Sequence, residues 1–317
     1  MNVEHNKTIK LFWALIKAVR PRQWIKNFAL FAGLIFSGQL DNPQSILSVF
    51  YAFTIFCGAT SATYLLNDVF DVERDRLHPF KSKRPIAAGL ISTKLAIALA
   101  LIIIAIIIPI SYQLSPALFL GIITYLILQL FYSSYLKSVI LLDVMAIAAG
   151  FVLRVYAGVW VIDAHLNVWF LLAVISFALF LAIGKRRSEL TLLHAQASKH
   201  RETLLHYPEN LLDILTAMFA NSTWLSYALF TFLQPPIFAQ PRFNFFFDAF
   251  PLPFAKAKYL MATVPVVIYG VMRYLYIIYE KKEGESPERV LLTDRPLLTT
   301  VVLWLVMVIG IIYYLGA

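Results

Sequence analysis

The stretch "SILSVFYAFTIFCGATSATYLLNDVFDVERD" (residues 45–75) passes directly from a long apolar run into a dense group of charges. Residues 45–66 are mostly apolar, and as a helix rising 1.5 Å per residue they are long enough to cross the roughly 30 Å hydrocarbon core of a bilayer. The whole chain of 317 residues has the same character, with 60% hydrophobic and 14% charged residues. A soluble globule of this composition would expose large apolar areas, so we expect an all-α integral membrane protein.

Nine apolar runs are long enough to be membrane spans, and they predict one transmembrane domain over residues 24–317. The nine runs are 24–40, 45–66, 92–110, 113–132, 138–162, 167–184, 210–234, 257–279 and 297–315. The preceding segment, residues 1–23, carries scattered lysines between apolar residues. This pattern is typical of an amphipathic helix that lies along the headgroups, and we expect that placement for it.

The distribution of Lys and Arg predicts the orientation, because these residues stay on the cytoplasmic side of span ends. Outside that set of loops stand Arg242, Lys256 and Lys258, and Arg154 lies within a span. We therefore expect a multi-pass protein of the plasma membrane with its amino end in the cytoplasm and its carboxyl end outside. The net charge of +9 is then a topology signal, and nucleic acid is not an expected partner. The sequence leaves the oligomeric state open.

Three carboxylates in "NDVFDVERD" are candidate metal ligands. Asp68, Asp71 and Asp75 are spaced i, i+3 and i+7, which places them within roughly a 60° arc of a helix, beside Asn67. Uncompensated carboxylates would repel one another, so a divalent cation between them is physically reasonable. Ligands that are all oxygen favour Mg²⁺. The alternative is a solvated helix end whose acids pair with the neighbouring arginines of the motif.

A basic loop follows the acids. "HPFKSKRPIAAG" (78–89) contributes Lys81, Lys83 and Arg84. A metal-binding acidic face beside a basic loop suits a diphosphate, because the metal bridges some of its oxygens and the bases take the rest.

These blocks resemble a known family. "NDVFDVERD" is similar to the first aspartate-rich motif of the UbiA superfamily of membrane prenyltransferases, at the cytoplasmic end of the second of nine helices. More narrowly, the chain resembles the decaprenyl-phosphate phosphoribosyltransferases in five blocks that run from about residue 20 to the end. These are "RPRQWIKN" (20–27), "NDVFDVERDRLHPFKSKRPIAAG" (67–89), "YSSYLKSVILLDVMAIAAGFVLRVYAG" (132–158), "GKRRSEL" (184–190) and "SPERVLLTDRPLL" (286–298). The resemblance implies a nine-helix bundle with an active-site cavity that faces the cytoplasm.

The chain departs from ordinary UbiA prenyltransferases after the sixth span. Where those enzymes carry a second acidic motif, this chain has Lys185, Arg186 and Arg187. Two anions are therefore expected in the pocket, one held through Mg²⁺ at the acidic face and one held directly by bases. The resemblance implies a magnesium-dependent glycosyltransferase that moves phosphoribose from 5-phosphoribosyl 1-diphosphate to a polyprenyl phosphate of the decaprenyl type, releasing diphosphate. The alternative is a UbiA-type transfer of an isoprenoid onto an aromatic or lipid acceptor.

The resemblance also assigns roles to individual residues. The catalytic group is Asn67, Asp68, Asp71, Asp75 and Arg154, an intramembrane charge of the kind that is a functional candidate by default. The donor-binding group is Lys81, Lys83, Arg84, Tyr132, Lys137 and Asp143. The group that binds the acceptor phosphate is Gln23, Lys26, Asn27, Lys185, Arg186 and Arg187.

Several of these residues have a structural alternative. Arg154 is otherwise an arginine bonded to another helix, Asp143 a polar link within the bundle, and Lys137 a topology charge. In "LLTDRPLL", Asp294 and Arg295 either contact substrate or form a salt bridge that stabilises the loop. A transporter is the alternative from a different class of protein. A transporter would have polar residues along a route through the membrane midplane, whereas here they gather near one membrane face.

Overall fold

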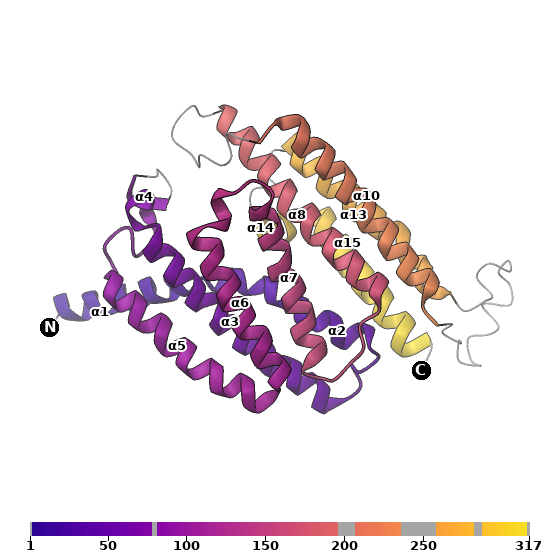
Figure 1. The fold of residues 1–317 in the computed structure, drawn as a ribbon, viewed down its shortest axis with the longest axis horizontal. Helices are drawn as coiled ribbons and strands as arrows, with labels where there is room; N and C mark the ends of the chain where they lie inside the picture. The colour runs from indigo at the N-terminus through magenta and orange to yellow at the C-terminus, as the bar shows by residue number, and fades with distance from the viewer. Residues whose placement is uncertain (1, 78–80, 196–206, 236–257, 282–286, 316–317) are drawn as a thin grey trace. The chain divides into compact units, whose positions relative to one another are not determined.

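The structure is a computed structural model that describes residues 2–77, 81–195, 207–235, 258–281 and 287–315. These residues form helices and short turns, and no strand occurs among them (Figure 1). Seven helical segments in the described ranges are long and apolar enough to cross a membrane: Pro43–Phe70, Thr93–Leu114, Pro116–Ser134, Leu142–Trp160, Val168–Thr191, Tyr259–Lys281 and Arg295–Leu315. The prediction of an all-α, multi-pass membrane protein is therefore confirmed, whereas the count of nine spans is not.

Two of the nine predicted runs are not among these seven. The run 210–234 coincides with helix α10 (Glu209–Leu233), which begins with acidic residues in its first turns. The run 24–40 is not one regular helix, because η1 (Pro21–Leu30) is a 3-10 helix and α2 (Phe31–Phe36) has six residues. The left-handed backbone of Arg20 (φ 53°) and the Pro21 that follows it separate this region from α1 (Asn2–Val19).

The chain packs as two compact units. The first comprises Met1–Gly33, Gln44–Ala146 and Leu153–Ala164, and the second comprises Leu34–Pro43, Ile147–Val152 and His165–Ala317.

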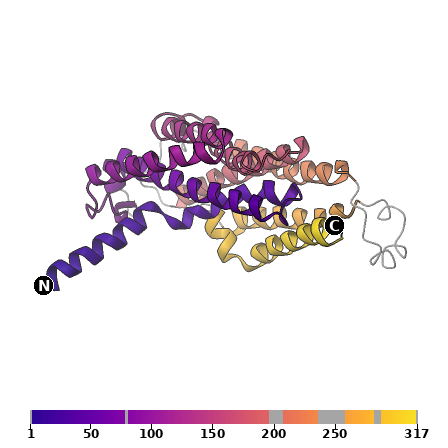
Figure 2. The same cartoon turned by 90° about the horizontal axis from the view of Figure 1, so that it is seen from below.

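The first unit contains the acidic motif, residues 67–75. It is built from α1, η1, α3 (Pro43–Phe70), α4 (Val72–Arg76), η2 (Lys81–Lys83), α5 (Thr93–Leu114), α6 (Pro116–Ser134), η3 (Leu136–Ser138) and most of α7 (Leu142–Trp160). Ser115 alone connects helices α5 and α6, so the two helices form an antiparallel hairpin. The Ser115 hydroxyl also caps the start of α6, because it accepts a hydrogen bond from Leu118 N at 3.4 Å. Figure 2 shows α1 leaving the other helices of this unit at its amino-terminal end.

A buried apolar cluster joins α1, α3 and α5. Small side chains such as Ala18, Ala62 and Ala96 allow these helices to approach closely, and Leu65 and Ile86 fill the remaining space. Ile86 belongs to the turn that follows η2, so the cluster holds the basic loop beside the carboxyl end of α3.

Glycine brings η1 against α7. A Cβ atom on Gly158 would lie only 1.9 Å from the Leu30 carbonyl oxygen, a distance that excludes any side chain at this position. This close approach places the buried Asn27 of η1 beside α7.

The second unit is a set of packed helices with its own core. It contains α8 (Val168–Ala195), α10, η5 (Tyr259–Thr263), α13 (Val264–Tyr276), η6 (Ile277–Lys281), α14 (Pro287–Thr293), α15 (Arg295–Ile309) and η7 (Gly310–Leu315). Phe180 of α8 lies edge-on to Tyr274 of α13, with ring centroids 5.3 Å apart, inside an apolar cluster that extends to α14 and α15.

Candidate active site

The acidic motif lies where α3 ends and α4 begins. The helical hydrogen bonds continue through the junction, since Asp71 N donates to Asn67 O at 3.0 Å and Asp75 N donates to Asp71 O at 2.8 Å. Asp68 and Asp75 are buried and Asp71 is partly buried, whereas the Glu73 side chain is 80% exposed and pairs with Arg76. The three aspartates are thus distinct from the solvated acid of the same motif.

Asp68 and Asp75 share one guanidinium group. The NH1 atom of Arg84 lies 3.1 Å from Asp68 Oδ1 and 2.5 Å from Asp75 Oδ2. Arg20 NH2 reaches the same Asp68 oxygen at 2.5 Å. Burial raises the pKa of Asp75 above its ordinary value of 3.8, while the positive charges of Arg84 and Lys81 act in the opposite direction. The partners of the two buried acids are therefore Arg20 and Arg84, and not the adjacent arginines of the motif.

The third aspartate is paired with a lysine from a distant turn. Lys137, in η3 between α6 and α7, donates from Nζ to Asp71 Oδ1 at 2.7 Å, and its side chain is only 11% exposed. A topology charge would remain in water, so this contact favours a role for Lys137 at the acidic motif. Tyr132, on the last turns of α6, is half-buried.

The donor atoms of the acidic motif fit Mg²⁺, but in this arrangement bases bind them. In the ranges that the structure describes, no three His, Cys, Asp or Glu side chains converge closely enough to hold a metal ion. The NH1 atom of Arg84 instead takes a bridging position between Asp68 and Asp75, as a cation between two carboxylates would. Carboxylate oxygens are the ligands that Mg²⁺ prefers, so the residues suit this ion if Arg84 gives way to it.

The segment 20–27 lies along α3 beside the acids. The Arg20 guanidinium is 4.6 Å from the centroid of the Tyr64 ring, and the Tyr64 hydroxyl donates to Gln23 Oε1 at 3.1 Å. Lys26 Nζ donates to the same Gln23 oxygen at 2.6 Å. Gln23 and Lys26, both predicted to bind the acceptor phosphate, are thus neighbours, and Tyr64 connects Gln23 to Arg20, the partner of Asp68.

Asn27 and Arg154 form a buried polar network inside the first unit. Arg154 Nε donates to Asn27 Oδ1 at 2.7 Å, and Arg154 NH2 donates to the hydroxyl of Tyr125 at 2.8 Å. Thr60 donates to the same Asn27 oxygen at 3.4 Å, and Asn27 Nδ2 donates to Cys57 Sγ at 3.3 Å. Asn27 is fully buried, so its contacts are those of a residue that positions Arg154.

The remaining residues of the predicted donor group lie at or near the acidic motif or at the start of α7. Lys81 and Lys83 belong to η2, and Lys83 is exposed, with its carbonyl oxygen accepting from Lys17 Nζ at 3.2 Å. Asp143 is buried in the first turn of α7, where its Oδ1 accepts from Val144 N at 2.8 Å. This contact is local to the first turn of α7, so both roles predicted for Asp143 stay predictions.

The three bases predicted to bind the lipid phosphate lie on α8 of the second unit. Arg186 is 1% exposed and its NH1 lies 2.5 Å from Glu189 Oε2. Arg187 Nε donates to Asp213 Oδ1 of α10 at 2.6 Å, and Lys185 Nζ lies 3.8 Å from Glu189. These bases are therefore compensated by acids of their own unit.

Asp294 is held by contacts within the second unit. Its carboxylate accepts from Leu297 N at 3.0 Å and so caps α15, and it pairs with Arg273 through two bonds of 3.0 and 2.8 Å. Lys281 adds a third cation at 2.8 Å. The salt bridge expected here exists, but its partners are Arg273 and Lys281. These partners lower the pKa of Asp294 well below its usual range.

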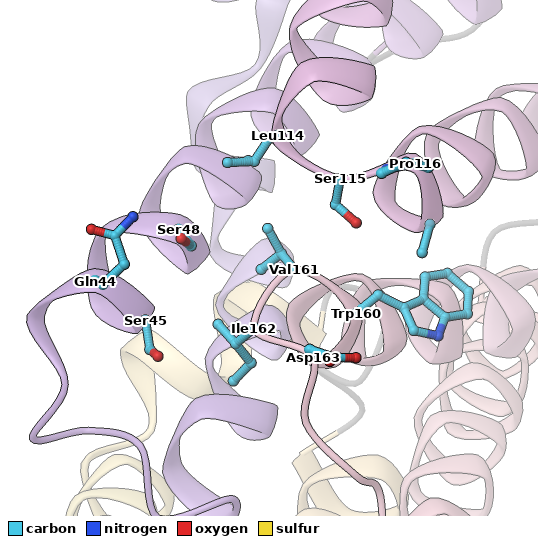
Figure 3. Close-up of a pocket in the computed structure, with 11 residues that line it drawn as sticks. Gln44, Ser45, Ser48, Leu114, Ser115, Pro116, Trp160, Val161, Ile162 and Asp163 are labelled. Atoms are coloured by element: carbon cyan, nitrogen blue, oxygen red, sulfur yellow. The ribbon is translucent and has the colours of Figure 1, made fainter.

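A pocket of about 580 Å³ in the first unit lies away from the acids (Figure 3). It is lined by polar residues such as Gln44 and Asp163 together with Trp160, around the start of α3 and the end of α7. The aspartates lie at the opposite end of the 28-residue helix α3, roughly 35 Å away at 1.5 Å per residue. This pocket is therefore not the predicted active-site cavity.

Sequence reasoning missed the partners of the predicted residues. Arg20 stands in the quoted block "RPRQWIKN", directly before Pro21. This position could have identified it as a candidate site residue. Tyr64 precedes Asp68 by one helical turn, a spacing that puts both on one face. Tyr125, Asp213 and Arg273 are contributed by other helices, and nothing in the local sequence indicates these contacts.

Comparisons with known proteins agree with this architecture. The profile of the UbiA prenyltransferase family matches residues 27–293. The chain is 35% identical over 304 residues to a decaprenyl-phosphate phosphoribosyltransferase of Mycolicibacterium smegmatis, covering 95% of this chain and 92% of that protein. It is 33% identical to the protein of the same name from Corynebacterium glutamicum, covering 94% and 86%.

A solved structure shares the fold. A UbiA homolog from Archaeoglobus fulgidus bound to GPP and Mg²⁺ superposes with a TM-score of 0.65 at 20% identity, over 94% of this chain and 99% of that one. With the profile match and the two relatives, this likeness leads to one conclusion: the chain belongs to the UbiA prenyltransferase family.

Proposed function

We propose that this protein transfers the 5-phosphoribosyl group from 5-phosphoribosyl 1-diphosphate to a polyprenyl phosphate and releases diphosphate. The observation that carries the proposal is the identity of 35% to a decaprenyl-phosphate phosphoribosyltransferase over 95% of the chain. The reaction takes place on the cytoplasmic face of the plasma membrane, the side at which the Lys and Arg distribution puts the acidic motif.

The acidic end of α3 is the proposed donor site. Asp68, Asp71 and Asp75 would hold Mg²⁺ together with the diphosphate, and the bound ion would neutralise charge on the leaving group. Arg84 and Lys137 contact the carboxylates in the structure, and we assign them to the phosphate oxygens of the donor once the ion takes their place. Lys81, Lys83, Tyr132 and Asp143 complete the proposed donor group, and Asn67 stays in the proposed catalytic group with the aspartates.

The nucleophile in this reaction is the lipid phosphate itself. One of its oxygens forms a bond to ribose C1 while the bond from C1 to the diphosphate oxygen breaks, and the electron pair leaves with diphosphate. A phosphate is ionised at neutral pH, so the protein supplies no general base. Gln23 and Lys26 of the first unit are the proposed ligands of this phosphate, and the same role for Lys185, Arg186 and Arg187 stays a prediction from the sequence.

Arg154 has a distinct place in the proposal. Its guanidinium is buried within a span and is oriented by Asn27 and Tyr125, so it presents a fixed positive charge in a region of low dielectric. A charge fixed in this way stabilises an anionic substrate more than the same charge in water does.

The proposal is tested with the purified protein in detergent, Mg²⁺ and polyprenyl phosphate. Donor labelled in the ribose should give labelled lipid, and EDTA or Asp71→Asn should abolish this transfer. Glu73→Gln is the matched control, because it neutralises an exposed acid of the same motif and should retain activity. Loss of transfer in both variants would mean that the motif acts through its net charge.

A second candidate is the transfer of an isoprenoid onto an aromatic or lipid acceptor. The likeness to a UbiA homolog bound to GPP and Mg²⁺ favours it. The bases at 185–187, where such enzymes have a second acidic motif, argue against it. A parallel reaction with prenyl diphosphate and an aromatic acid distinguishes the two, and turnover there alone would overturn the phosphoribosyl assignment.

A further inference from the structure

The segment 20–27 is bound to α3 through a ladder of side-chain contacts. Trp24 Nε1 donates to Ser61 Oγ at 3.0 Å, and Asn27 contacts both Thr60, directly before Ser61, and Cys57, one turn closer to the start of α3. At the other end, Arg20 reaches Asp68. The segment therefore runs antiparallel to α3, and each contact steps down the same face of the helix.

Tyr64 lies at the centre of this ladder and contacts two residues of the segment. Its ring supports the guanidinium of Arg20 at 4.6 Å, and its hydroxyl donates to Gln23 at 3.1 Å. Tyr64 also precedes Asp68 by one turn, so the ring and the carboxylate hold Arg20 from two sides.

We propose that Tyr64 is a positioning residue of the candidate active site. Its ring keeps Arg20 against Asp68, and its hydroxyl keeps Gln23 in place. This inference rests on the proposed function for the roles of Asp68 at the donor and Gln23 at the acceptor phosphate.

Two substitutions separate the two contacts of Tyr64. Tyr64→Phe keeps the ring under Arg20 and removes the hydroxyl from Gln23. It should raise the KM for polyprenyl phosphate about threefold to tenfold, the effect of one lost hydrogen bond, and leave the KM for the sugar donor unchanged. Tyr64→Leu removes both contacts and should raise both KM values by similar factors.

The single cysteine of the chain gives a readout that does not require activity. Cys57 is buried and lies under Asn27, at the far end of the ladder, so its rate of reaction with a membrane-permeant maleimide reports how firmly the segment is held. Tyr64→Leu should raise this rate about tenfold, and Tyr64→Phe should raise it by a smaller factor. Tyr51→Leu, on the exposed face of the same helix, is the matched control and should leave the rate unchanged.

The outcomes distinguish this inference from the proposed function. If the wild type transfers no phosphoribose, the proposed function fails, and the order of the labelling rates still decides whether Tyr64 holds the segment. A Tyr64→Leu protein with the labelling rate and KM values of the wild type would overturn the inference. The same holds if Tyr64→Phe and Tyr64→Leu raise both KM values equally, because the ring and the hydroxyl would then have no separate roles.

Discussion

Lys137 and Asp71 form an ion pair of 2.7 Å although 66 positions separate them in the sequence. The pair joins η3, between α6 and α7, to the end of α3, and it is largely shielded from water. A lysine held this way has lost much of its hydration, so a phosphate oxygen of the donor can replace Asp71 as its partner at a small additional cost.

Lys137→Gln should therefore impair transfer. The substitution removes a charged hydrogen-bond donor, for which about 1.5–3 kcal/mol is typical, and this corresponds to a roughly 10- to 100-fold lower kcat/KM for the sugar donor. The measurement is steady-state kinetics with the donor varied. Lys94→Gln, an exposed lysine at the start of α5, is the control and should behave as wild type. An unchanged kcat/KM in Lys137→Gln would return Lys137 to the role of a topology charge.

Arg84 competes with a metal ion for the same carboxylates, because one of its nitrogens bonds to both Asp68 and Asp75. Arg84→Met should thus increase the affinity for Mn²⁺, a probe for Mg²⁺, while it lowers transfer activity. We expect the Mn²⁺ affinity to rise roughly tenfold. Two unit charges 4 Å apart interact with ~4 kcal/mol at an effective dielectric constant of 20, and a tenfold change in affinity corresponds to a fraction of that energy.

The affinity is best measured by titration calorimetry at pH 8, because burial raises the pKa of Asp75 and protons would compete with the metal at lower pH. Arg76→Met removes an exposed guanidinium that pairs with Glu73 and serves as the control. Weaker Mn²⁺ binding in Arg84→Met would show that Arg84 supports the metal site and does not compete with it.

The sequence predicted local features well and contacts between helices poorly. The aspartate spacing predicts that Asp68 and Asp75 share one helix face, and one nitrogen of Arg84 reaches both, because helical periodicity depends only on neighbours in the chain. The pairing of Lys137 with Asp71 depends on how α6 and α7 pack against α3, and no local pattern contains that information. Likewise Asp294 pairs with Arg273, which precedes it by 21 positions, and not with the adjacent Arg295 that the sequence suggested.

The run 24–40 shows a different limit of sequence reasoning. Its apolar composition indicates a span, but composition does not report backbone conformation. The left-handed Arg20 and the contact of Leu30 with Gly158 fix a 3-10 helix here, and both depend on tertiary packing. The fully buried Asn27 follows from the same packing, since a polar residue in an apolar run can face either lipid or a partner.

Asn27 should contribute to stability through Arg154. Asn27→Ala removes the acceptor of the Arg154 Nε–H group in a buried site, which typically costs about 1–3 kcal/mol. The expected result is a lower midpoint of thermal unfolding in detergent. Asn27→Asp is the matched variant, because it retains an acceptor oxygen and should keep the midpoint near that of the wild type. Equal losses in both variants would contradict a role through this hydrogen bond.

Asp294 should make stability depend on pH in acid. Its partners Arg273 and Lys281 hold the pKa of the folded carboxyl below the ordinary 3.8. A depressed pKa stabilises the fold above the pKa of the unfolded chain, and this contribution is lost as the pH falls toward the pKa of the folded state. Asp294→Asn keeps a cap for α15 but removes the charge, so its unfolding midpoint should lie below that of the wild type by a constant amount from pH 8 to pH 5. Below about pH 4 the two midpoints should converge, because the unfolded wild type then takes up a proton that the folded state still excludes. Thermal scans of both proteins across this range test the prediction, and a difference that stays constant down to pH 3 would show that the charge of Asp294 does not stabilise the fold.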